Sequence, residues 1–143
     1  MSLYLLDTSA LLTLRDDEPG ADRVAQLLQQ AQRGQAQVLG CFLTQMELLY
    51  RVWRDDSEAA GRLALEQWLA LPIEWIHESP ELLTKAAEIK ARYPLSLADA
   101  WIAASAALAH ATLVHKDPEF SALPLAQELL PLKPLKAAKT PRA

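Results

Sequence analysis

The sequence predicts an α/β protein of three layers, in which helices cover both faces of a central, mostly parallel sheet of four or five strands. Short apolar segments of strand length alternate along the chain with longer segments of helical periodicity. The first apolar segment, residues 3–6, is apolar throughout, as is typical of a strand buried on both faces in the middle of a parallel sheet.

Length and composition indicate one globular domain at residues 1–132, followed by a basic tail at residues 133–143 that we expect to be disordered. The 143 residues are 51% hydrophobic and 22% charged, which is typical of a globular protein. The single cysteine, Cys41, excludes an intrachain disulfide and a cysteine-based zinc site. The sequence has no signal-peptide pattern and no apolar stretch of transmembrane length, so we expect a cytoplasmic protein with no membrane partner.

The charge is unevenly distributed along the chain. The net charge is −4, but residues 133–143 hold four basic and no acidic residues, so the remainder carries −8. An acidic body argues against a protein that binds nucleic acid through phosphate contacts alone. It allows bound divalent cations to neutralise part of that charge.

The apolar segments and the helical periodicity place each element in order. Strands are predicted at residues 3–6, 38–42, 73–76, 112–115 and 129–132, and helices at residues 8–15, 19–33, 44–54, 58–71, 80–92 and 100–109. Pro19 suits the first position of the second helix. Thr44 and Glu47 have the spacing of a capping box. The strand at residues 129–132 contains Pro131, which suits the edge of a sheet better than its centre.

Four acidic residues each lie at the cap or in the first turn of a predicted helix: Asp7, Glu47, Asp99 and Asp117. Two of them directly follow a predicted strand, and Glu47 lies a few residues after one. In a doubly wound sheet these helix starts share one edge, which is where ligands bind. Each acid alone fits helix capping, because a carboxylate accepts free backbone N–H groups. Together the four acids would place several carboxylates around one cleft.

Such a cluster repels itself and requires counter-charge. A hard divalent cation supplies that charge, and Mg²⁺ or Mn²⁺ fits a site of carboxylates and water. A metal held in this way generates a hydroxide nucleophile and stabilises the transition state of phosphodiester cleavage. The residues therefore predict metal-dependent phosphodiester hydrolysis.

Four motifs carry a resemblance to a known family. They are Leu5-Leu6-Asp7-Thr8-Ser9-Ala10, Glu47 in its helix, Leu97-Ala98-Asp99-Ala100-Trp101-Ile102-Ala103, and Leu113-Val114-His115-Lys116-Asp117-Pro118-Glu119-Phe120. In this order and spacing the chain, up to about Leu132, resembles a PIN domain, and within that family it is most similar to VapC-type toxins.

The resemblance implies an endoribonuclease that depends on Mg²⁺ or Mn²⁺ and cleaves an RNA substrate. It implies the toxin of a toxin–antitoxin pair, commonly a homodimer, held inactive by a cognate antitoxin protein. Asp7 and Asp99 would be the central metal ligands, and Glu47 and Asp117 would complete the site. Ser9 would hydrogen-bond a water or a substrate phosphate.

One position departs from the family pattern. Two residues before the last acid the family usually has Thr or Ser, and this chain has His115. An imidazole there could orient metal-bound water or bind a softer metal. The simpler interpretation, which we favour, is a histidine at the end of a strand with its hydrogen bonds satisfied.

Other polar and aromatic residues have simpler interpretations than catalysis. We expect Lys116, beside the acids, to be solvated rather than bound to phosphate. The helix-surface cations Arg15, Arg51, Arg54 and Lys90 are weak indications of an RNA path, and Glu119 is expected to be a first-turn helix charge. The apolar group Leu48, Leu49, Tyr50 and Trp53 is a candidate surface for a second copy or for an antitoxin.

Two alternatives to a nuclease are open. A catalytically weak or inactive PIN-like module would bind RNA or a protein partner, and His115 with the acidic body motivates this alternative. A phosphatase of the haloacid dehalogenase type would need a second Asp two positions after Asp7, where this chain has Ser9, so we rank it low.

Overall fold

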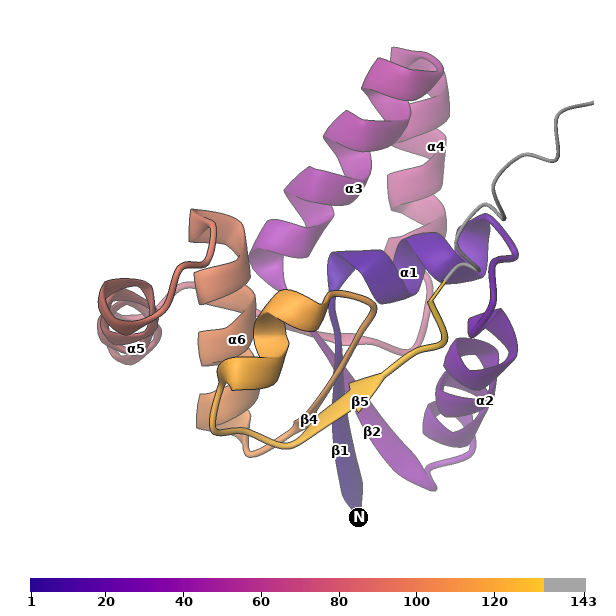
Figure 1. The fold of residues 1–143 in the computed structure, drawn as a ribbon. Coiled ribbons are helices and arrows are strands. Elements are labelled where there is room, and N and C mark those ends of the chain that lie inside the picture. Colours follow the sequence, from indigo (N-terminus) through magenta and orange to yellow (C-terminus); the bar gives the residue numbers. More distant parts are fainter. Residues whose placement is uncertain (133–143) are drawn as a thin grey trace, which may run out of the picture.

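The computed structural model describes residues 1–132 (Figure 1), so the predicted tail at residues 133–143 lies outside the described residues. The elements follow in the order β1 (Ser2–Leu6), α1 (Thr8–Arg15), α2 (Ala21–Gln32), β2 (Ala36–Cys41), α3 (Phe42–Asp55), α4 (Glu58–Leu69), β3 (Glu74–Ile76), α5 (Pro80–Arg92), α6 (Leu97–Ala109), β4 (Thr112–His115), the 3₁₀ helix η1 (Pro118–Ala122) and β5 (Gln127–Leu129). No helix within this part of the chain combines the length and the apolar character needed to cross a membrane.

The five strands of residues 1–132 form one sheet in the order β3-β2-β1-β4-β5, and every neighbouring pair is parallel. β1 lies in the middle, where Leu5 pairs with Leu39 on one side and with Leu113 on the other. This central place explains why the first apolar segment has no polar alternation, since both of its faces are covered. The predicted three-layer α/β/α class is confirmed.

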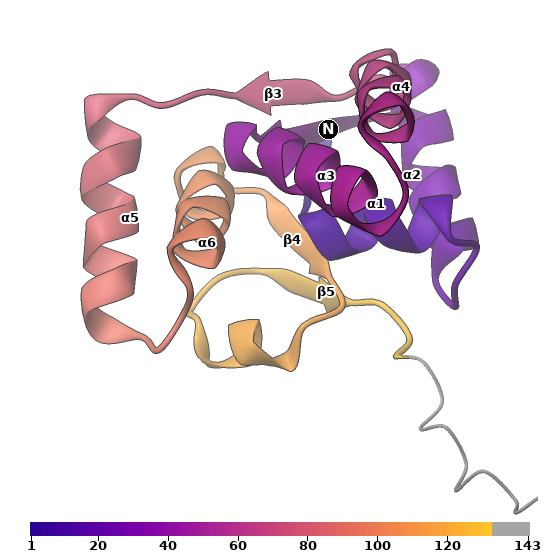
Figure 2. The ribbon, with the colours of Figure 1, turned by 90° about the horizontal axis from the view of Figure 1, so that it is seen from above.

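Successive residues of β1 point into two separate hydrophobic clusters, one on each face of the sheet. Leu5 belongs to the cluster built with α5, α6 and η1, and Leu6 to the cluster built with α1, α2, α3 and α4. Figure 2 shows the same division, with α5 and α6 on one flank and α1 and α2 on the other. Because the strands are parallel, their carboxyl ends meet at one edge, and β1 and β4 there lead into α1 and η1.

Three predicted helix starts are wrong. α6 begins at Leu97 rather than at residue 100, because Ser96 caps it, and the errors at α3 and α2 also have a local reason. β2 runs directly into α3, so Cys41 is the N-cap and Thr44 lies inside the first turn rather than capping it. Thr44 is fully buried, and its hydroxyl contacts another part of the chain. α2 begins at Ala21, because Gly20, in the left-handed region with φ 102°, separates the helix from Pro19. Only a residue without Cβ adopts that conformation readily.

The fifth strand lies two residues earlier than predicted, at Gln127–Leu129 rather than at residues 129–132. Leu130 still donates its backbone N–H to the carbonyl of His115 at 2.7 Å, and its side chain is buried. Pro131 has no N–H to donate, so the pairing stops there. The sheet therefore uses the apolar Leu130 as a core residue just beyond the strand.

Helices α3 and α4 form a hairpin that projects from the body of the molecule (Figure 1). They approach most closely at Gly61, where a Cβ atom would lie 2.9 Å from the Leu49 carbonyl oxygen and 3.1 Å from the Trp53 nitrogen. Both neighbouring atoms belong to the backbone, so a change of side-chain rotamer cannot relieve the clash. The hairpin thus depends on the missing side chain at this position.

We predict that Gly61→Ala destabilises the protein. Ala in place of Gly inside a helix would by itself stabilise it by about 1 kcal/mol. Here the backbone clash pushes α3 and α4 apart, and overpacking of this kind costs roughly 1–3 kcal/mol, so the net change is a loss. Urea denaturation measures it, with the exposed Ala59→Gly as the control for helix propensity alone. A more stable Gly61→Ala protein would contradict the close approach.

Candidate active site

Asp7 lies at the junction of β1 and α1 with only 4% of its surface exposed. Its Oδ1 atom accepts hydrogen bonds from the Ser9 hydroxyl at 2.6 Å and from the Ala10 backbone N–H at 2.8 Å. The predicted capping role is therefore confirmed. Both bonds use one oxygen, and within residues 1–132 the structure gives the other oxygen, Oδ2, no hydrogen-bond donor. Oδ2 is the atom of Asp7 that is available to a ligand.

Ser9 ties the start of α1 to the loop that follows β4. Its hydroxyl donates to Asp7 and accepts the backbone N–H of Lys116 at 3.0 Å. Asp117 comes next in that loop, caps η1 and accepts the Glu119 N–H at 2.9 Å. Through Ser9, the first acid of the chain and the last candidate acid are fixed relative to each other.

Three carboxylates approach one another closely. One oxygen each from Asp99, Asp117 and Glu119 lies within 4.8 Å of the other two. Asp99 stands in the first turn of α6, where its backbone N–H is capped by the Ser96 hydroxyl at 3.2 Å. Our sequence interpretation favoured a helix-charge role for Glu119 over a supporting role at the site. The 3₁₀ turn started by Pro118 brings its side chain back toward Asp117, and that turn is the local signal that could have identified it.

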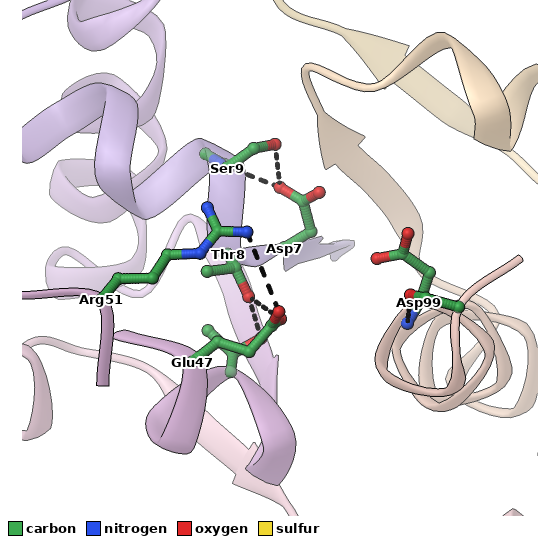
Figure 3. Close-up of polar contacts among 9 residues, drawn as sticks. Asp7, Thr8, Ser9, Glu47, Arg51 and Asp99 are labelled. Carbon is green, nitrogen blue, oxygen red and sulfur yellow. Dashed lines mark hydrogen bonds and ion pairs between the residues drawn. The ribbon is translucent and has the colours of Figure 1, made fainter. Parts of the chain in front are cut away.

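Glu47, on α3, approaches the same region from the opposite side. Its Oε1 accepts a hydrogen bond of 2.6 Å from Thr8, and its Oε2 lies 4.0 Å from an arginine nitrogen of Arg51. Figure 3 shows the carboxyl groups of Asp7, Glu47 and Asp99 directed toward the space between the starts of α1, α3 and α6. All four sequence-predicted acids thus lie at one edge of the sheet, and Glu119 joins them.

Electrostatics supports this grouping. Burial raises the pKa of Asp7 to about 7, the bonds from Ser9 and Ala10 oppose that rise, and the charges of Asp99 and Asp117 add to it. Burial also raises the pKa of Asp99 to about 6, with further contributions from Asp117 and Glu47. The carboxylates therefore repel one another in a partly desolvated place, which is the condition that favours a bound cation.

The model of the PIN domain family matches residues 4–125, which is most of the chain. The chain belongs to the PIN domain family. This match spans β1 to the end of the loop before β5 and so includes every carboxylate of the site. No curated protein matches the chain significantly.

Solved structures show the same fold. VapBC2 from Rickettsia felis bound to a promoter DNA fragment aligns with a TM-score of 0.74 at 20% identity, over 90% of this chain and 99% of that chain. DNA-bound VapBC from Salmonella typhimurium aligns with a TM-score of 0.73 at 18% identity, over 90% of this chain and 98% of that chain. VapC20 of Mycobacterium tuberculosis, a toxin that cleaves the sarcin-ricin loop, aligns with a TM-score of 0.69 at 18% identity. The alignment covers 90% of this chain and 99% of that chain.

In this PIN domain His115 lies buried at the end of β4. The side chain is 1% exposed; Nδ1 accepts the Asp117 backbone N–H at 3.0 Å and Nε2 lies 2.9 Å from Gln127 Oε1. Because Nδ1 is the acceptor, we assign the ring proton to Nε2, which donates to Gln127. Burial lowers the pKa of His115, which keeps the ring neutral. Both ring nitrogens have protein partners, as the strand-end interpretation expects, and His115 positions Asp117.

Lys116 differs from its predicted environment. Its ammonium nitrogen is shielded from solvent, and within residues 1–132 it has no hydrogen-bond partner. Burial lowers the pKa of this amine. The prediction of a solvated lysine is therefore wrong.

The raised pKa of Asp7 predicts a pH-dependent stability in metal-free buffer. Between the unfolded value of 3.8 and the folded value of about 7, the folded protein holds a proton that the unfolded chain has released. The contribution of Asp7 to the free energy of unfolding therefore falls as the pH rises through this window. In Asp7→Asn the capping oxygen remains and the titration is lost. We expect this variant to be more stable than the wild type at pH 8, on the order of a few kcal/mol.

Urea denaturation at a series of pH values with a chelator measures this difference. The advantage of Asp7→Asn shrinks toward pH 4, where the wild-type carboxyl is neutral in both states. Glu66→Gln, an exposed carboxylate on α4, is the matched control and shows no such trend. Parallel curves for Asp7→Asn and the wild type would contradict the assigned desolvation.

Proposed function

We propose that this PIN domain is a metal-dependent endoribonuclease and the toxin of a toxin–antitoxin pair. The observation that carries the proposal is a group of carboxylates at the carboxyl edge of the sheet. Oxygens of Asp99, Asp117 and Glu119 lie within 4.8 Å of one another, with Asp7 before α1 and Glu47 on α3 at the same edge. Family membership supports hydrolysis of a phosphodiester bond, and the fold is shared with several toxins of solved structure.

The donor set fits a hard divalent cation. All candidate ligands are carboxylate oxygens, the kind that Mg²⁺ and Mn²⁺ prefer, and no cysteine or free imidazole is among them. Asp99 and Asp117 belong to the close group, which also includes Glu119, whereas Asp7 and Glu47 lie outside it. By the family resemblance, Asp7 and Asp99 would hold the ion, with Glu47 and Asp117 completing the site. When bound, such an ion lowers the pKa of water and stabilises the negative charge that develops on the phosphate.

The protein's own groups would orient the reactants. Ser9 and the Ala10 N–H hold Oδ1 of Asp7, which leaves Oδ2 to accept a hydrogen bond from an attacking water. The hydroxyl of Ser9 is itself engaged with Asp7 and with the Lys116 N–H. Ser9 would therefore act by fixing Asp7, rather than by binding the substrate phosphate directly.

An RNA path would lead past α1 and α3. A hollow of about 360 Å³ between α1 and the C-terminal part of α3 brings together Arg15, Arg51 and Arg54, which the sequence placed on separate helix surfaces. Guanidinium groups bind phosphate in a bidentate manner. Three aspartates also line the hollow, and two of them pair with Arg15 and Arg54. Arg51, nearest the acids, is the arginine we assign to the RNA backbone.

An antitoxin would bind the projecting α3–α4 hairpin. Of the apolar group predicted from the sequence, Leu48 is buried in the core, but Tyr50 and Trp53 are about 40% exposed, together with Met46 and Leu63 nearby. The similar structures from Rickettsia felis and Klebsiella pneumoniae are, by their descriptions, VapBC2 and a toxin–antitoxin complex. A homodimer and a cytoplasmic site of action, where RNA is found, complete the proposal.

Asp99→Asn tests the enzyme directly. We expect it to cleave purified total RNA at least about 100-fold more slowly than the wild type in Mg²⁺ or Mn²⁺, because a central ligand is lost while the fold is kept. Gel electrophoresis of end-labelled RNA measures the rate, and Glu66→Gln is the control. A wild-type protein that binds RNA without cleaving it would favour the alternative, a non-catalytic binding module.

Metal affinity should depend on pH. Binding requires ionised carboxylates, and the pKa values of Asp7 and Asp99 are about 7 and 6 in the metal-free protein. We therefore expect the affinity for Mn²⁺ to rise between pH 5.5 and pH 7.5 and to level off above that. Isothermal titration calorimetry in buffers of different ionisation enthalpy also detects the released protons. An affinity independent of pH over this range would exclude Asp7 and Asp99 as ligands.

A further inference from the structure

Thr8 connects the first acid of the site to the second. It follows Asp7 directly, is 4% exposed, and begins α1. Its hydroxyl donates to Glu47 Oε1 at 2.6 Å across 39 positions of the sequence, and it lies 3.2 Å from the Thr44 hydroxyl. Thr44 is fully buried on α3, one turn before Glu47. Figure 3 shows this contact between the α1 start and α3.

Arg51 approaches the other oxygen of the Glu47 carboxylate. It stands one helical turn after Glu47 on α3, a spacing at which Glu and Arg side chains readily meet. The closest approach is nevertheless 4.0 Å, from Arg51 Nη2 to Glu47 Oε2. The Glu47 side chain is 13% exposed and that of Arg51 is 38% exposed. Glu47 therefore points inward to the neutral donor, Thr8, although a cation is within reach on its own helix.

We propose that the Thr8 hydroxyl is a positioning group, which holds Glu47 directed at the acidic site and prevents it from turning out to Arg51. This inference rests on the proposed metal-dependent function, since it assigns Thr8 the task of presenting one ligand. The Thr44 hydroxyl, 3.2 Å from that of Thr8, helps to hold the Thr8 hydroxyl in place. The requirement is for an oxygen at position 8, so Ser satisfies it and the isosteric Val does not.

The long side chain of Glu47 explains why a positioning residue is needed. Glu47 is the only one of the candidate ligands carried on α3, and its long side chain has three rotatable bonds. A ligand that must first be ordered binds more weakly than one already in place. Hydrogen bonds from outside the ligand set commonly change metal affinity 10–100-fold in other proteins.

Isothermal titration calorimetry with MnCl₂ tests the proposal on the wild type and four variants. We expect Thr8→Val to bind Mn²⁺ at least about tenfold more weakly than the wild type, and Thr8→Ser to bind within about threefold of it. In the Glu47→Gln background, Thr8→Val should weaken binding no further, because its effect passes through Glu47. The melting temperature of each variant checks that it is folded.

A second readout needs no metal. In a crystal structure of metal-free Thr8→Val, the Glu47 carboxylate should lie closer to Arg51 than 4.0 Å. An unchanged Glu47 position, or equal Mn²⁺ affinity in Thr8→Val and the wild type, would overturn the role of Thr8 and leave the metal site intact. A wild-type protein that binds no Mn²⁺ would instead overturn the proposed function, and this inference with it.

Discussion

The burial of Asp7 at the end of the central strand is the constraint on which the candidate site depends. A carboxylate in this place is separated from water by the sheet and by α1, so its pKa rises to about 7. Among residues 1–132, a hydroxyl and one backbone N–H stabilise its charge, and both act on the same oxygen. Asp99 and Asp117 add repulsion. The fold thus retains a carboxylate whose charge is best balanced by a cation.

Small hydroxyl side chains hold the acids in their places. Ser9 links α1 to the loop after β4, Thr8 links α1 to α3, and Ser96 caps the first turn of α6 beside Asp99. None of these groups carries a charge, so they orient the carboxylates with little neutralisation. An arginine or lysine in the same positions would neutralise the carboxylates and so compete with a cation for them.

The sequence was most informative where the deciding interaction is local. Asp7 and Asp117 cap the elements that follow them, because an Asp before a helical turn meets backbone N–H groups two or three residues on. The same rule gave a wrong prediction at Thr44. β2 continues into α3 without a loop, so the helix begins before Thr44. The closeness of Glu119 to Asp99 could not be predicted, because Asp99 lies on another helix.

The sequence by itself determined the alternation of strands and helices, hence a parallel sheet whose carboxyl edge collects the acids. These features depend on periodicity and on contacts within a few residues. Only the tertiary structure decided which oxygen of Asp7 is available, that Glu47 accepts a hydrogen bond from Thr8 while Arg51 lies 4.0 Å away, and that both nitrogens of His115 are occupied. Those outcomes depend on how distant segments pack, and a local pattern carries no information about them.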